Sequence, residues 1–138
     1  MATYTKFNSF VEALAEKAHN LGSDTLEVCL TAAANAPVAT NTVLANLTPI
    51  SYTNCSARTI TTSSSAQSSG TYKLVLADLT LTASGGTVGP FRYVTIFNQT
   101  ASNDELICFY DYGSEITLQA GETFTIDFDG TNGLLQLA

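Results

Sequence analysis

The sequence of 138 residues has few charged side chains and very few cations. Only 12% of its residues are charged, about half of the usual share of roughly 25%. Binding to nucleic acid needs clustered cations along one surface, and binding to a membrane surface needs a polybasic run. The five cations are instead scattered along the chain: Lys6, Lys17, Arg58, Lys73 and Arg92. With a net charge of -7, this distribution predicts no nucleic-acid partner and no membrane partner.

Long apolar runs and closely spaced cysteines are also absent from the sequence. No run approaches the ~20 apolar residues that a membrane-spanning helix needs. Glu12, Glu16 and Lys17 interrupt the one apolar stretch near the N-terminus, so we expect no secretory signal. The cysteines are odd in number and far apart: Cys29, Cys55 and Cys108. We therefore expect synthesis in a reducing cytoplasm, with Cys29 and Cys108 as small buried apolar residues.

The residues that catalysis would require are scarce. His19 is the single histidine, so any Ser-His-Asp arrangement would have to use it, but a histidine near a helix end is also an ordinary structural placement. Paired carboxylates for glycoside hydrolysis usually come with aromatic residues that stack on sugars, and the sequence has no tryptophan. The candidate carboxylates are Asp104, Glu105, Asp111, Glu115 and Glu122. We expect no enzymatic activity and no cofactor, and we interpret Asp111 as a partner of a nearby turn backbone.

One acidic stretch has two interpretations. In the segment 127–133, Asp127, Asp129 and Asn132 offer oxygen ligands of the kind that calcium prefers. The twelfth position of a calcium-binding EF-hand loop must be acidic, and here that position is Ala138. Asp-Gly and Asn-Gly pairs are also the preferred residues of tight hairpin turns. We therefore favour a turn over a metal site.

The segment 89–112 is the most apolar part of the chain and predicts an antiparallel hairpin. Two runs of β-branched and aromatic residues flank a short polar loop, as is typical of paired strands. Alternation places Phe91, Tyr93 and Phe97 on one face and Val94 and Ile96 on the other. Because both faces are apolar, both must be covered, which favours a central position in the fold.

Further elements are expected on both sides of this hairpin. Apolar residues at three- and four-residue spacing predict a helix over 5–20, which would cover one face of the hairpin. Alternating strands are expected over 24–31, 57–65, 72–83, 114–118, 122–128 and 134–137. The segment 63–70 is rich in serine and predicts a flexible turn, and a change of apolar face near Asp78 predicts a bulge or a corner between sheets.

Together these elements predict one domain over residues 1–138 that is mainly β. We expect an antiparallel β-sandwich or flattened barrel with one N-terminal α-helix. Residues 1–22 would form an N-terminal arm and helix, and residues 23–138 would form the sandwich.

Several stretches resemble small structural proteins of tailed bacteriophages. The N-terminal part of the resemblance is Lys6-Phe-Asn-Ser-Phe-Val-Glu-Ala-Leu-Ala-Glu-Lys-Ala-His-Asn-Leu-Gly22. The C-terminal part comprises Gly89-Pro-Phe-Arg-Tyr93, Asp111-Tyr-Gly113, Ala120-Gly-Glu-Thr-Phe124 and Asp127-Phe-Asp-Gly130. The resemblance implies a virion protein, by analogy a decoration (cement) protein that binds and stabilises the outside of the capsid. It implies the major capsid protein as partner and a multicopy or homo-oligomeric state, and it carries over no catalytic residue.

Two other functions remain open from the sequence. The protein could be a tail or fibre component of the virion, or a carbohydrate-binding module that uses the aromatic residues around Tyr110 and Tyr112. For the decoration function we expect residues 2–7 to be an arm on the neighbouring capsid protein. The expected capsid contacts are Tyr4, Lys6 and Phe7.

Overall fold

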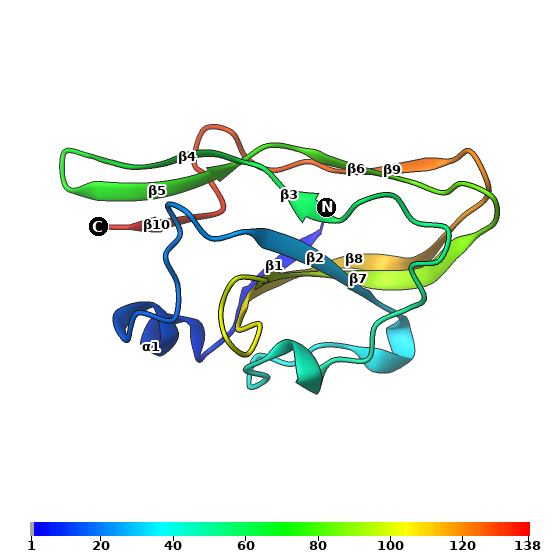
Figure 1. Cartoon of the computed structure of the whole chain (residues 1–138), viewed down its shortest axis with the longest axis horizontal. Coiled ribbons are helices and arrows are strands. Elements are labelled where there is room, and N and C mark those ends of the chain that lie inside the picture. Colours follow the sequence, from blue (N-terminus) through cyan, green and yellow to red (C-terminus); the bar gives the residue numbers. More distant parts are fainter. Residues whose placement is uncertain (1) are drawn as a thin grey trace.

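The computed structural model describes residues 2–138 and shows two stacked layers of antiparallel strands (Figure 1). The strands are Thr3–Lys6 (β1), Leu26–Thr31 (β2), Thr59–Ile60 (β3), Thr62–Ser68 (β4), Thr71–Leu76 (β5), Leu79–Thr82 (β6), Val88–Asn98 (β7), Leu106–Leu118 (β8), Thr123–Ile126 (β9) and Leu135–Leu137 (β10). One layer is a five-stranded sheet in the order β1-β8-β7-β2-β3. The other layer contains a three-stranded sheet, β10-β5-β4, and a two-stranded sheet, β6-β9.

The expected fold class is confirmed. The protein is mainly β with antiparallel sheets and a single short α-helix, α1 (Phe10–Ala15), near the N-terminus, and its two layers resemble a β-sandwich. Short 3₁₀-helices, η1 (Ala33–Asn35) and η2 (Leu44–Asn46), interrupt the long connection between β2 and β3. No helix among residues 2–138 is long and apolar enough to cross a membrane.

The hairpin of β7 and β8 lies at the centre of the five-stranded sheet, as its two apolar faces predicted. Val94 and Ile96 face the second layer, whereas Tyr93 and Phe97 belong to a separate cluster on the opposite face. Phe91 was expected beside Tyr93 but packs in the inner cluster with Val94. The reason is a register irregularity between Phe91 and Tyr93, which breaks the strict alternation of sides.

A long connecting segment covers the outer face of this sheet. The outer cluster consists of Phe7, Cys29, Tyr93, Phe97, Leu106 and Phe109. Leu44 and Leu47, from the segment 32–50, pack against it, and Figure 1 shows this segment below the five-stranded sheet, on the side away from the second layer. The predicted helical cover is therefore wrong for this face. The helix is too short for that task and instead inserts Phe10 into the inner cluster.

The N-terminal helix was predicted over 5–20, but only residues 10–15 are helical. Thr3–Lys6 forms β1 instead, because its alternating residues pair with β8 in the chain's own sheet. The helix ends before Lys17, which has a left-handed backbone with φ of 72°. The apolar residues over 5–20 do have helical spacing, but they belong to a strand, a short helix and a turn. These elements bury their apolar residues in two different clusters.

Two expectations about the second layer have opposite outcomes. The serine-rich segment 63–70 was predicted as a flexible turn, but most of it is strand β4, which pairs with β5 in a hairpin. Backbone pairing outweighs the weak strand preference of serine here. The change of face near Asp78 does mark a break between two sheets, because β5 ends at Leu76 and β6 begins at Leu79 in a different sheet of the same layer.

Candidate binding surface at the edge of the sandwich

The three residues predicted to contact a capsid lie on or beside β1. Tyr4 is 39% exposed and Lys6 is exposed, so both side chains reach the surface. Phe7 is fully buried in the outer cluster, where its ring lies 5.2 Å from that of Phe109. The expected free arm is therefore an edge strand of the protein's own sheet. Phe7 stabilises this strand and is not available at the surface of the folded chain.

Strand β1 leaves one side of its backbone open. It is the outermost strand of its sheet and pairs only with β8, with Tyr4 opposite Tyr110 and Lys6 opposite Cys108. The N–H of Phe7 donates a hydrogen bond to the carbonyl oxygen of Ile107 at 3.1 Å. Because hydrogen-bonded and non-hydrogen-bonded pairs alternate, the backbone groups of Tyr4 and Lys6 point away from β8. Their N–H and C=O groups are thus free to bond another strand.

A groove opens at the Ala2 end of β1, between the two layers. Its volume is about 550 Å³. Its lining comes from the chain preceding β1, from β7, β8 and β9, and from the turn that follows β9: Ala2, Val94, Tyr110, Tyr112, Thr123, Phe124, Thr125, Ile126, Asp127 and Asp129. Strand β9 pairs only with β6, so its other edge is also free. The groove therefore lies between the start of β1 and the strand β9, over an apolar floor.

Aromatic rings in edge-to-face contact shape this groove. The Tyr112 ring stands at 84° to Phe124 with centroids 5.5 Å apart, and Phe124 in turn packs on the buried Phe91. At the β1 side, Tyr4 packs on Tyr110 at 5.4 Å and 63°. Burial raises the pKa of Tyr110 above its usual range, so this phenol stays protonated and can donate a hydrogen bond. Tyr112 remains 47% exposed, which leaves a large apolar side chain at the rim of the groove.

Two carboxylates lie at one end of the groove. Asp129 accepts hydrogen bonds from the backbone N–H groups of Thr131 and Asn132, both at 2.8 Å, and these bonds lower its pKa. Residues 129–133 thus form the predicted turn. Asp127 is exposed and is not tied into the turn. None of the cations among residues 2–138 lines the groove, although Lys73 donates a hydrogen bond to the carbonyl of Thr131 at 3.2 Å and lies close enough to Asp129 to help lower its pKa.

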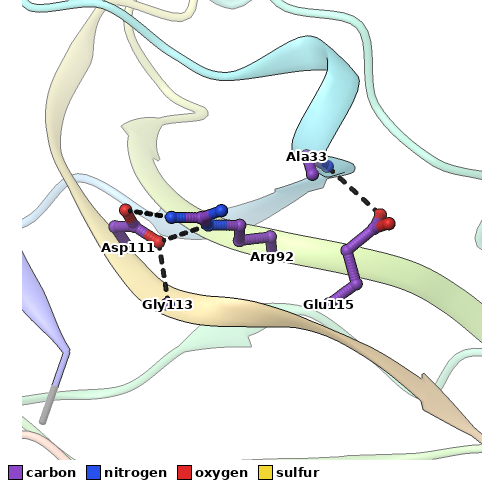
Figure 2. A network of polar contacts seen from close by, with 5 residues as sticks. All are labelled: Ala33, Arg92, Asp111, Gly113 and Glu115. Atoms are coloured by element: carbon purple, nitrogen blue, oxygen red, sulfur yellow. Dashed lines mark hydrogen bonds and ion pairs between the residues drawn. The ribbon is translucent and has the colours of Figure 1, made fainter.

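A polar network on the outer face of β8 anchors Asp111 and Gly113, the two neighbours of Tyr112 in the chain (Figure 2). Arg92 makes a two-pronged ion pair with Asp111, with distances of 2.8 and 3.0 Å. Asp111 also accepts a hydrogen bond from the backbone N–H of Gly113, as the sequence predicted for this carboxylate. The bond from Arg92 lowers the pKa of Asp111, so the pair stays charged at neutral pH. Tyr112 lies between Asp111 and Gly113 in the chain. Because side chains alternate along β8, the Tyr112 side chain points to the opposite face of the strand, into the groove.

Three of the other carboxylates named from the sequence have local roles. Glu115 accepts a hydrogen bond from the N–H of Ala33 at 3.2 Å, which ties the segment 32–50 to β8 (Figure 2). Glu105 bonds Asn103, and Glu122 bonds the backbone of Gln119. Residues 2–138 contain no group of three potential metal-binding side chains.

His19 lies in a buried polar cluster away from the groove. It is 5% exposed, its Nδ1 accepts a hydrogen bond from Asn98 Nδ2 at 3.0 Å, and its ring packs on Phe10. The same amide group donates to the carboxylate of Asp24 at 2.7 Å. Burial lowers the pKa of His19, which keeps the imidazole neutral. His19 therefore links the segment after α1 to the end of β7, and it does not cap a helix because α1 ends at Ala15.

Sequence reasoning did not identify the part of the surface that β9 contributes. Thr123, Phe124 and Thr125 were placed on a strand, but their position at a free edge depends on which strands are neighbours. The sequence contains only a weak indication that Tyr112 is exposed, because this residue directly follows a run of buried residues that alternate between two apolar faces.

The comparisons with known proteins give no family for this chain. No protein-family model, curated protein or solved structure matches it. The function therefore has to be argued from the sequence and the surface described above.

Proposed function

We propose that this protein is a structural component of a tailed-phage virion that decorates the outside of the head. The observation that carries the proposal is the open edge of β1. The sequence named Tyr4 and Lys6 as contacts, and in the structure the same two residues have unpaired backbone groups and surface-exposed side chains. Strand addition to such an edge is a common mode of protein attachment. The proposed partner is the major capsid protein, and the proposed location is the capsid surface.

The small contact area of one short strand fits a multicopy protein. Strand β1 has four residues, so one such contact alone would bind weakly. Many copies on one particle, or several contacts within an oligomer, multiply weak contacts into stable attachment. The scarcity of charge lowers the energetic cost of close packing between copies, because few charged groups must be desolvated when the copies come together.

The location is tested by separating heads from tails of the phage and identifying their proteins by mass spectrometry. We expect the protein in the head fraction, in a fixed ratio to the major capsid protein. Recovery in the tail fraction would support a tail or fibre component instead. Absence from both fractions would refute a virion role.

The β1 contact is tested on heads that lack the protein, to which purified variants are added back. Lys6→Pro removes an outward N–H that β8 does not use, and edge strands tolerate proline at such positions. Lys6→Ala keeps the N–H and removes the side chain beyond Cβ, including its charge, as Lys6→Pro also does. We expect Lys6→Pro to lower occupancy far more than Lys6→Ala does, at an unchanged melting temperature. Equal occupancy for both variants and the natural sequence would exclude β1 as the attachment strand.

A deletion of residues 2–6 is a poorer test. It removes the whole of β1 and exposes the edge of β8, so a loss of occupancy would not distinguish a lost contact from a damaged sheet.

A further inference from the structure

We propose that the groove and the β1 edge together bind one extended segment of the partner protein. The segment would add a strand beside β1, insert an apolar side chain into the groove, and place a lysine or arginine next to Asp127. This inference rests on the proposed function, because it defines the partner chemistry of the same attachment surface. It goes further by stating the sequence pattern that the partner must carry.

The backbone geometry determines how the segment lies. A strand added beside β1 would hydrogen-bond to the outward N–H and C=O groups of Tyr4 and Lys6. Every second side chain of that strand would then point to the same face as Tyr4 and Tyr110, which is the face toward the second layer. This direction leads into the groove, because Ala2 and Tyr110 both line it. The two parts of the surface can therefore be used by one continuous strand.

The groove sets the size and type of the anchoring side chain. Its volume of about 550 Å³ is enough for a large apolar residue and the adjoining chain. The floor is formed by Val94, Ile126 and the ring of Phe124, which favour an aliphatic or aromatic anchor. Tyr110 and Tyr112 line the groove, and a phenol hydroxyl can bond the backbone of an incoming segment.

Charge complementarity selects a basic residue at one end of the segment. Asp127 and Asp129 are the charged residues that line the groove, and Lys73 lies close enough to Asp129 to offset part of its charge. Asp129 is already held by the turn, whereas Asp127 is exposed and free to pair with a cation. The charged residue of β1 is Lys6, which lies four residues after Ala2. Its positive charge favours an acidic or neutral residue at the facing position of the bound segment. An acidic residue beside Asp127 would be repelled.

A neutral sugar is the competing ligand for the same aromatic residues. It would use the faces of Tyr112 and Phe124 and the oxygens of Asp127, but it would leave the amides of Tyr4 and Lys6 unpaired. The peptide accounts for the open β1 edge as well as for the groove, so the observations favour a peptide.

The test uses the full chain and a displayed library of short random peptides, with maltohexaose as the sugar probe. Enriched peptides are synthesised and titrated into ¹⁵N-labelled protein. We expect them to share an apolar anchor and a lysine or arginine, and to shift the amide signals of Tyr4, Lys6 and Thr123. Asp127→Lys should weaken binding about tenfold or more. The matched control Glu16→Lys reverses an exposed charge outside the groove and should change nothing.

The possible outcomes separate this inference from the proposed function. If no peptide is enriched, if enriched peptides are acidic, or if their signals map elsewhere, the inference is overturned. It is also overturned if maltohexaose shifts the groove signals and peptides do not. Specific peptide binding by a protein that is absent from heads would overturn the proposed function while leaving the groove chemistry in place. Presence in heads without peptide binding would overturn the inference alone.

Discussion

Replacing Phe7 by alanine distinguishes a core strand from a free arm. Phe7 has no exposed surface and packs on the ring of Phe109 in the outer cluster. Removing a fully buried phenylalanine costs about 3–5 kcal/mol. We expect the low end of this range, about 3 kcal/mol, because the outer cluster is small and covered by a connecting segment that can partly collapse. That loss is large beside a total free energy of unfolding of about 5–15 kcal/mol.

Urea denaturation followed by circular dichroism measures this effect. With a slope of about 2 kcal/mol/M, the midpoint should fall by about 1.5 M without a change in slope. The control is Val11→Ala, because Val11 is 50% exposed on α1 and its truncation should cost no more than about 0.5 kcal/mol. A loss below about 1 kcal/mol for Phe7→Ala would refute the placement of Phe7 in the core. It would mean that residues 2–7 leave the sheet in solution, as a free arm would.

Three other predictions concern a titratable group, a turn and the thiols. Because burial lowers the pKa of His19, the unfolded chain binds a proton more readily than the folded protein does, and the free energy of unfolding should fall as pH drops from about 6.5. Urea midpoints measured at several pH values should show this fall, and His19→Gln should abolish it. Gly133 has φ of 80°, and a Cβ there would lie 2.5 Å from a backbone oxygen of β5. Gly133→Ala should therefore lower the free energy of unfolding, measured by denaturation, by about 1–3 kcal/mol. Gly130 has open space around it, so the control Gly130→Ala should be nearly neutral. Burial raises the pKa of Cys108 to about 12 and raises that of Cys29 above its usual value. A thiol reagent should therefore label the half-buried Cys55 first and all three cysteines only in urea. Rapid labelling of all three cysteines in the native protein would contradict the burial of Cys29 and Cys108.

The N-terminal segment shows why local patterns can mislead. Phe7, Phe10 and Leu21 have the spacing of one helical face, yet Phe7 packs in the outer cluster and the other two in the inner cluster. The short alternating stretch before Phe7 has a partner in β8, and pairing with a central strand outweighs helix propensity. The sequence located Tyr4 and Lys6 as surface residues but could not show that Phe7 is buried.

The candidate site was predictable only in part. Tyr110 and Tyr112 stood out because aromatic residues continue beyond the buried part of the hairpin, and the turn at 129–133 was evident from its Asp-Gly and Asn-Gly pairs. The groove also needs β9, which follows β8 in the sequence but lies in the other layer, and it contributes Thr123 and Thr125 from there. No periodicity within one segment encodes which edge of another segment stays unpaired.

By itself, the sequence determined the fold class, the central position of the β7–β8 hairpin and the break between sheets near Asp78. These features follow from alternation and turn chemistry, which act between residues close together along the chain. Only the tertiary structure decided the register irregularity that moves Phe91 to the inner cluster, the cover of the outer face by residues 32–50, and the open edges of β1 and β9. The physical reason is that sheet order and register depend on side-chain packing between segments far apart in the sequence, where a shift of one residue exchanges the two faces of a strand.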